Sequence, residues 1–414
     1  MKGNQAVQSS LFQNRFVRTI LLSNILLQIG IWVRNFSVLL FVMEQTGNDP
    51  YAVSLISVAE YAPIFLFSFI GGTFADRWRP KRTMVWCDML SATSVFAVFA
   101  TLLFGSWKAV FFATLVSAIL SQFSQPSSMK LFKQHVPAEQ VQQGMALFQT
   151  NTAIFMILGP VFGTLVFQSF GIQTSMVVTG IAFFLSAAVL TRLPADRSEV
   201  QAKSSTGFWR ELYDGVQYVK SKYVLTALAG TFAAIGLASG ITQPLGVFLL
   251  TERLHLPKEN LQWFMMVNGA AMLIGGGLIA SLSKKVAPQR LLAIGMLAAA
   301  IALATMGMST SIALTVVAQF MIGFFFPCFM IGISTLILQN TEQSFIGRVN
   351  GVLNPFFMGM MVISMSTAGW VKDKFSLLIV YEAAGAVFII GLLFVIPLFK
   401  LPYQQKEPTA QPQK

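Results

Sequence analysis

Charged side chains are scarce in this sequence. The 414 residues include 28 Lys and Arg and 16 Asp and Glu, whereas 55% of the residues are hydrophobic. An ordinary soluble domain has about 25% charged residues, so we expect lipid to surround most of this chain. The basic residues lie in short segments between apolar stretches and form no basic, aromatic-rich surface. We therefore expect no nucleic-acid partner.

Cysteine and histidine are almost absent. Cys87 and Cys328 lie far apart in apolar segments, and His135 and His255 lie in predicted loops. This spacing indicates neither a disulfide framework nor a metal site. A Walker-type phosphate loop and a nucleophile–base constellation are also missing. The sequence therefore predicts neither an enzyme nor an ATP-driven pump, and we expect no cofactor.

Twelve apolar segments are long enough to cross a hydrocarbon core of about 30 Å. They cover, approximately, residues 17–43, 51–74, 84–104, 108–129, 143–168, 172–193, 223–250, 261–283, 289–308, 311–338, 346–371 and 376–399. We predict an all-α polytopic membrane protein of twelve transmembrane helices. With both termini on one side, the segments on that side hold 22 of the 28 Lys and Arg residues and the opposite loops hold five. The positive-inside rule then predicts cytoplasmic termini.

The longest segment between spans, residues 194–222, divides the chain into two halves. We expect a six-helix half at 1–193, a cytoplasmic linker at 194–222, a second six-helix half at 223–400 and a cytoplasmic tail at 401–414. Within the linker, residues 208–223 place Phe208, Leu212, Val216 and Val219 on one helical face, which is typical of an interfacial amphipathic helix.

The two halves also share local patterns. Gly71-Gly72 before the basic cluster at 77–82 recurs as Gly276-Gly277 before Lys284, about 205 residues later. Such a six-span repeat is expected of transporters that alternate access around a central site.

The loop after the second span resembles a signature of the major facilitator superfamily. Residues 71–84 read GGTFADRWRPKRTM, with a glycine, an Asp-Arg pair and a basic cluster. The resemblance implies that Gly72, Asp76 and Arg77, together with Asp88 in the next span, form a latch for the outward-open state. A basic loop that only sets topology is the alternative for the remaining cations. Arg79 stands where the signature usually has a turn glycine, and Pro80 replaces a basic residue.

The fifth span contains LGPVFGTLV at 158–166, similar to the Gly-Pro-x-x-Gly core found in exporters of this superfamily. Gly159 and Gly163 lie one turn apart and flatten one helix face, and Pro160 is able to kink the span, as suits a helix at the interface between the halves. The layout, including VPAEQVQQGMAL at 136–147, most resembles macrolide-efflux transporters. This resemblance implies a bacterial plasma-membrane protein that works as a monomer on a small-molecule substrate in the lipid bilayer.

Three ionisable residues lie well inside predicted spans: Arg34, Glu60 and Glu382. An unpaired charge at mid-depth costs about 2.5–3.5 kcal/mol on insertion scales. At 1.5 Å per residue, Arg34 and Glu60 have matching depths, so we predict that they pair. The functional hypothesis is that Glu60 binds a proton or a cationic substrate in exchange for Arg34, and the alternative is a static ion pair. Glu382 is the weaker candidate, because the last span is peripheral in the superfamily.

Polar residues also occur on the spans that line the central cavity in the superfamily. They are Asn24, Gln28 and Asn35 in the first span, Gln122 and Gln125 in the fourth, Gln243 in the seventh and Gln319 in the tenth. Trp32, Phe36 and many Phe and Met residues accompany them, a mixture that suits an amphipathic ligand.

The leading hypothesis is a secondary active exporter, coupled to protons, that moves amphipathic compounds. A dedicated carrier for a siderophore, lipid or metabolite and a non-transporting receptor or scaffold are the alternatives.

Overall fold

The computed structural model describes residues 14–136, 138–194, 208–283 and 286–400. Side chains are described throughout these ranges except at 68–77, 133, 138–139, 142, 208–209 and 400. Every regular element in the described ranges is a helix or a helical turn. Eleven of these helices are long and apolar enough to cross a membrane.

Five long helices form the first part of the chain, which we call the N-terminal bundle. They are α2 (Arg15–Thr46), α3 (Pro50–Arg77), α4 (Pro80–Leu103), α5 (Val110–His135) and α6 (Ala138–Thr191). The 54-residue α6 contains two of the predicted spans, and its backbone leaves the helical region at Gly171, where φ is 73°. Glycine adopts this positive φ without a steric penalty. The eleven helices therefore supply the twelve predicted crossings.

The remainder of the chain forms a second group of helices, the C-terminal bundle. A helix within the predicted linker, α7, precedes it at Phe208–Ser221. The bundle consists of α8 (Tyr223–Thr242), α9 (Gly246–Phe248), η2 (Leu249–Arg253), α10 (Leu261–Leu282), α11 (Pro288–Met308), α12 (Ile312–Asn340), α13 (Ile346–Lys374), α14 (Leu377–Val395) and η4 (Ile396–Lys400). Short turns η1 (Trp107–Ala109) and η3 (Lys258–Asn260) precede α5 and α10.

The span predicted at 223–250 is not one continuous helix. It stops after Thr242, turns through Pro244 and restarts as α9, and the Leu245 N–H bonds to the carbonyl of Thr242 three residues back. Proline has no N–H to donate and its ring clashes with the preceding turn, so a helix breaks at this position. Gln243, at the break, is exposed and its side chain reaches Tyr61 of α3 in the other bundle.

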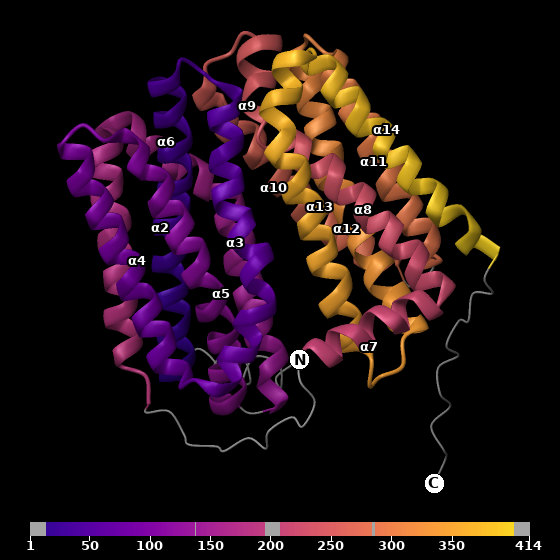
Figure 1. Cartoon of the computed structure of the whole chain (residues 1–414), viewed down its shortest axis with the longest axis horizontal. Helices are drawn as coiled ribbons and strands as arrows, with labels where there is room; N and C mark the ends of the chain where they lie inside the picture. Colours follow the sequence, from indigo (N-terminus) through magenta and orange to yellow (C-terminus); the bar gives the residue numbers. More distant parts are fainter. Residues whose placement is uncertain (1–13, 137, 195–207, 284–285, 401–414) are drawn as a thin grey trace, which may run out of the picture.

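The two bundles stand side by side, with α3 next to α13 (Figure 1). Helix α6 of the first bundle also packs against α10 of the second. A Cβ built on Gly369 in α13 would lie 2.6 Å from the Cα of Tyr51 in α3, and one on Gly269 in α10 would lie 2.9 Å from Ile157 in α6. Glycine allows helices to approach this closely. The end of the molecule that carries α7 is called the α7 end below, and the other is called the opposite end.

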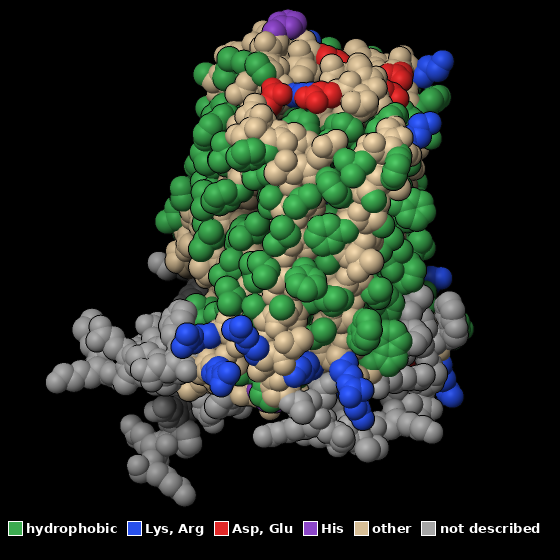
Figure 2. All heavy atoms as spheres, turned by 90° about the vertical axis from the view of Figure 1, so that its left-hand side faces the viewer, with side chains coloured by type: hydrophobic (Ala, Val, Ile, Leu, Met, Phe, Trp, Pro, Cys, Tyr) green, Lys and Arg blue, Asp and Glu red, His purple; other side chains and the backbone are tan. Residues whose placement is uncertain are grey.

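The surface is divided into bands, as expected for a protein that crosses a membrane several times. Figure 2 shows hydrophobic side chains over the middle of the face presented by the N-terminal bundle, Lys and Arg side chains gathered toward the α7 end, and Asp and Glu side chains at the opposite end. A lipid-facing band with charge confined to its edges is the arrangement that a bilayer imposes.

Candidate functional site

A cavity of about 590 Å³ lies between the two bundles. Its lining comes from α2, α3 and Met156 of α6 on one side and from the broken span, α10, α11, α12 and α14 on the other. A volume of this size suits a drug-sized molecule. Most lining side chains are apolar, and they include Phe326, Phe329 and Phe388.

Five of the polar residues predicted for the site line this cavity. They are Gln28, Asn35, Glu60, Gln243 and Gln319, and the predicted aromatics Trp32 and Phe36 line it as well. Glu60 is the single Asp, Glu, Lys, Arg or His among the lining residues of the described chain. The cavity is therefore a largely uncharged space with one carboxylate on its N-terminal wall.

Arg34 and Glu60 are linked, but the predicted direct pair is wrong. Arg34 donates from Nε and Nη2 to Oδ1 of Asn35 at 3.1 and 2.7 Å, and Asn35 donates from Nδ2 to Oε1 of Glu60 at 2.7 Å. Among the described residues, the ion pairs within 4 Å are Lys258–Glu44 and Lys372–Glu252. Arg34 is 3% exposed and is absent from the cavity lining.

The correction follows from helix geometry. Consecutive residues on an α-helix point about 100° apart, since one turn takes 3.6 residues. Asn35 faces the cavity and α3, so the side chain of Arg34 points into the bundle. The guanidinium reaches back to the amide of its neighbour, and that amide reaches Glu60. Counting residues along two helices predicts that two side chains lie at the same depth in the membrane. It does not predict in which direction around the helix axis each side chain points.

Four other predicted residues lie outside the cavity lining. Gln122 donates to Ser121 Oγ on its own helix at 3.1 Å, and Gln125 is exposed. Asn24 accepts a hydrogen bond from Asn151 of α6 at 2.5 Å. Glu382 lies beside Gly307 of α11, with Oε1 buried and without a hydrogen-bond partner.

The sequence did not single out two polar groups of the cavity. Tyr61 of α3 accepts a hydrogen bond from Gln243 Nε2 of the other bundle at 3.4 Å, directly beside Glu60. Asn268 of α10 lines the cavity and donates to the carbonyl of Gln319 at 3.2 Å. Tyr61 could have been identified from its position next to the carboxylate of Glu60 inside the span. Asn268 could have been identified as an amide within an apolar helix.

The structure describes the side chains of only part of the predicted latch. The side chains of Gly72, Asp76 and Arg77 lie outside the described residues. Asp88 of α4 is 3% exposed and accepts a hydrogen bond from Ser186 Oγ of α6 at 2.6 Å. Ser186 is also within 2.8 Å of Ser23 Oγ of α2, so Asp88 belongs to a buried polar layer that joins three helices.

The span expected to suit the interface between the halves does contact the other bundle, since α6 packs against α10, but its Gly159 and Gly163 face the inside of the N-terminal bundle. A Cβ on Gly159 would meet the Trp32 ring, and one on Gly163 would lie 2.6 Å from the carbonyl oxygen of Trp32. Helical geometry continues through Pro160, and the non-helical residue of α6 is Gly171. The flat glycine face of α6 therefore packs against α2, the helix that carries Arg34 and Asn35. One close contact of α6 with the other bundle lies at Met156 and Ile157, next to Gly269 of α10.

An ion pair that the sequence did not predict joins the bundles at the opposite end. Lys258 Nζ, before α10, lies 3.0 Å from Glu44 Oε1 at the end of α2 and donates to the Leu40 carbonyl at 3.3 Å. This contact and the close approach of Gly369 to Tyr51 hold the bundles together at the end away from α7.

The sequence as a whole matches a known family model. The model described as Major Facilitator Superfamily matches residues 20–250 and 226–414. The chain is 23% identical over 407 residues to the Uncharacterized MFS-type transporter YkuC of Bacillus subtilis, covering 95% of this chain and 94% of that protein. It is also 23% identical over 361 residues to the Multi-drug resistance efflux pump PmrA of Streptococcus pneumoniae, covering 86% of each chain. It is 25% identical over 369 residues to the Multidrug efflux pump Tap of Mycolicibacterium fortuitum, covering 86% of this chain and 89% of Tap.

Solved transporter structures share the fold. The nucleoside transporter NupG aligns with a TM-score of 0.72 at 14% identity, covering 94% of this chain and 100% of NupG. The peptide transporter POT in complex with sulfate aligns with a TM-score of 0.72 at 12% identity, covering 93% of this chain and 94% of POT. At these identities the likeness concerns the arrangement of helices alone.

Proposed function

Since this chain belongs to the major facilitator superfamily, we propose that it is a secondary active exporter of amphipathic small molecules, coupled to protons, and that it works by alternating access. Membership makes the chain a transporter and not an enzyme. Export is supported by the similarity to multidrug efflux pumps. We further propose that the α7 end faces the cytoplasm of a bacterial cell, since the predicted inside segments carry most of the Lys and Arg residues.

The observation that carries this proposal is the single carboxylate in the cavity. Glu60 faces a space whose opposite wall includes methionine, phenylalanine and amide side chains but no charged one among the described residues. A compound with one basic group and an apolar body would place the base at Glu60 and the body against the C-terminal bundle. Thioether and aromatic side chains adapt to varied apolar shapes. A carboxylate that exchanges a cation for a proton is a direct means of coupling, because a buried charge needs one or the other to be neutralised.

The test is uptake of a cationic dye into inverted membrane vesicles under an imposed proton gradient. We expect wild type to accumulate dye and Glu60→Gln to lose the dependence on the gradient. Glu382→Gln is the matched control, because it removes a carboxylate from a membrane helix outside the cavity lining and should keep gradient-driven transport.

The opposite results are equally informative. Full gradient dependence in Glu60→Gln at matched expression would remove Glu60 from the coupling mechanism. If wild type moves none of a chemically broad panel of dyes, the multidrug proposal fails and a carrier dedicated to one substrate becomes the better hypothesis.

A further inference from the structure

The amide of Asn35 has one possible orientation. Its Oδ1 accepts from two nitrogens of Arg34, and its Nδ2 donates to Oε1 of Glu60. A guanidinium only donates and an ionised carboxylate only accepts. Turning the amide over would place N–H groups against the guanidinium and an oxygen against the carboxylate. Arg34 therefore orients Asn35, and Asn35 in turn holds Glu60.

The three side chains differ in their access to the cavity. Asn35 and Glu60 line it, whereas Arg34 is 3% exposed and does not. A cationic ligand in the cavity would therefore meet the carboxylate without meeting the guanidinium. Within the described chain, the hydrogen bond from Asn35 is the one hydrogen bond made to Glu60, so Oε2 carries none.

We infer that Asn35 is a positioning residue that occupies Oε1 of Glu60 and leaves Oε2 as the oxygen that takes up a proton or a cation. This inference deepens the proposed function and rests on it, because it explains why proton and substrate would exclude each other. The hydrogen bond from Asn35 is strongest when Glu60 is ionised. A proton on Oε1 would break that bond, whereas a proton on Oε2 would preserve it, so protonation is directed to the oxygen that a bound cation needs.

Few other charged or titratable groups face Glu60. Arg34 of α2 acts through Asn35, Tyr61 is its neighbour on α3, and Tyr381 of α14 lines the same cavity. Apart from Arg34, the helices packed against α3 carry their described charges near their ends: Arg15, Arg18 and Glu44 on α2, Lys130 and His135 on α5, and Arg348, Lys372, Asp373 and Lys374 on α13. Asn35 is thus the group best placed to set how readily Glu60 takes up a proton.

The test uses a hydrophobic carbodiimide, dicyclohexylcarbodiimide, which reacts with protonated carboxyl groups. Full-length protein in liposomes is labelled across a pH series, and modification of Glu60 is quantified by mass spectrometry. Replacing Asn35 by Leu, which has nearly the same size, removes the donor to Oε1. We expect the pH of half-maximal labelling to rise by about one unit, since a hydrogen bond to a charged group changes proton affinity by about tenfold or more.

Two further variants make the result specific. Asn35→Gln keeps an amide and should return the midpoint toward the wild-type value. Gln122→Leu removes an amide from a helix of the same bundle but outside the cavity lining, and should leave the midpoint unchanged. If Asn35→Leu does not give a folded protein, Asn35→Ser replaces it, because serine is too short to span both partners and should give the same upward shift.

The cation tetraphenylphosphonium, which has no titratable group, separates this inference from the proposed function. Protection of Glu60 by the cation together with the shift in Asn35→Leu supports both. A shift without protection supports the role of Asn35 and counts against export of such cations. An unchanged midpoint in Asn35→Leu overturns the inference, and protection of wild type would then leave the proposed function standing.

Discussion

The two bundles differ in where their polar groups lie. The N-terminal bundle has a buried guanidinium, the carboxylate of the cavity and the buried carboxylate of Asp88. The wall contributed by the C-terminal bundle has amides, hydroxyls, thioethers and aromatic rings but no Asp, Glu, Lys or Arg among its described residues. One bundle therefore supplies the charged group of the cavity, and the other supplies an uncharged wall.

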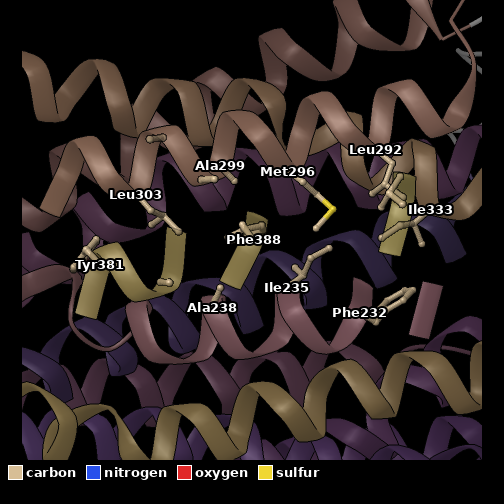
Figure 3. Packing of buried hydrophobic residues seen from close by; sticks show 14 of the residues in the cluster. Phe232, Ile235, Ala238, Leu292, Met296, Ala299, Leu303, Ile333, Tyr381 and Phe388 are labelled. Carbon is tan, nitrogen blue, oxygen red and sulfur yellow. The ribbon is translucent and has the colours of Figure 1, made fainter. Parts of the chain in front are cut away.

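The hydrophobic cores also differ in size. The largest core lies mainly in the C-terminal bundle and runs through α8, α11, α12 and α14, with Met296, Leu303 and Phe388 among its members (Figure 3), and two smaller clusters form around Phe264 and around Cys328. The N-terminal bundle has two separate cores, one around Phe132 near the α7 end and one around Val38 and Val95 toward the opposite end. The Ser23–Ser186–Asp88 layer lies between them.

Glycine packing adds a third difference. Cβ atoms built on Gly240, Gly275 and Gly323 would collide with backbone atoms of a neighbouring helix, as would one on Gly163 of the N-terminal bundle. Those on Gly30, Gly144 and Gly180, and on Gly230 of the C-terminal bundle, would meet phenylalanine rings. Rings are able to rotate away and backbones are not. Because backbone collisions are more frequent among the described glycines of the C-terminal bundle, we expect that bundle to resist deformation more than the N-terminal bundle does.

The largest expected effect comes from breaking the backbone packing of the C-terminal bundle. In Gly275→Ala, the new methyl group would lie 2.8 Å from the carbonyl carbon of Phe324, and overpacking of this kind typically costs about 1–3 kcal/mol. The loss should appear as a lower midpoint of thermal unfolding in detergent.

The adjacent residue provides the control for this prediction. Gly276 has no neighbouring atom within 4 Å of a built Cβ, so Gly276→Ala should be neutral or stabilising by up to about 1 kcal/mol. In Gly180→Ala the ring of Phe96, which is 36% exposed, should turn aside at a smaller cost. Equal destabilisation by Gly275→Ala and Gly180→Ala would contradict the proposed difference between the bundles.

Much of the fold was predictable from the sequence because a bilayer fixes helix length and apolar content. The family model and the helices of the structure confirm the twelve-span fold. The boundary predicted between the fifth and sixth spans, after residue 168 and before residue 172, agrees with the non-helical Gly171 inside α6. The break at Pro244 was not predicted, because a proline inside an apolar run is a feature that many membrane helices tolerate.

The residue types of the site were predictable from the sequence, but the directions in which their side chains point were not. Depth along the helices brought Arg34 and Glu60 to one level, and hydropathy identified Gln28, Gln243 and Gln319 as unusual polar residues in spans. Whether a side chain faces the cavity depends on rotation about each helix axis, which neighbouring helices determine. This is why the sequence did not show that Arg34 points inward or that Gln122 lies outside the lining. The contact of Lys258 with Glu44, at the end of α2, depends on how the two bundles pack against each other.

A smaller effect is expected from removing the polar layer of the N-terminal bundle. Ser186→Ala deletes the donor to Asp88 Oδ2 and the partner of Ser23 Oγ, and leaving buried polar groups unsatisfied costs about 1–3 kcal/mol. Part of this cost should be recovered because the N-terminal bundle adjusts, so the unfolding midpoint should fall by less than in Gly275→Ala. Ser281→Ala, which removes an exposed hydroxyl bonded to its own helix, should change stability by less than about 0.5 kcal/mol. A larger loss in Ser186→Ala than in Gly275→Ala would reverse the comparison.

The smallest effect concerns the contact between the bundles at the opposite end. The side chains of Lys258 and Glu44 are 14% and 47% exposed, and partly exposed ion pairs contribute about 0.2–1 kcal/mol. Lys258→Gln should therefore raise the open fraction at this end by up to about fivefold. The readout is the rate at which a membrane-impermeant maleimide, added on the Glu44 side, labels a cysteine at Ser57 of the cavity wall, with Cys87 and Cys328 replaced by alanine.

The second ion pair is a matched control for the first. Lys372 Nζ lies 2.7 Å from Glu252 Oε1, and both residues belong to the C-terminal bundle, so Lys372→Gln should leave the labelling rate unchanged. Exchanging the charges of the first pair, Glu44→Lys with Lys258→Glu, should return the rate toward that of the parent. If Lys258→Gln and Lys372→Gln raise the rate equally, loosening within the C-terminal bundle admits the reagent, and that bundle is not the more rigid of the two.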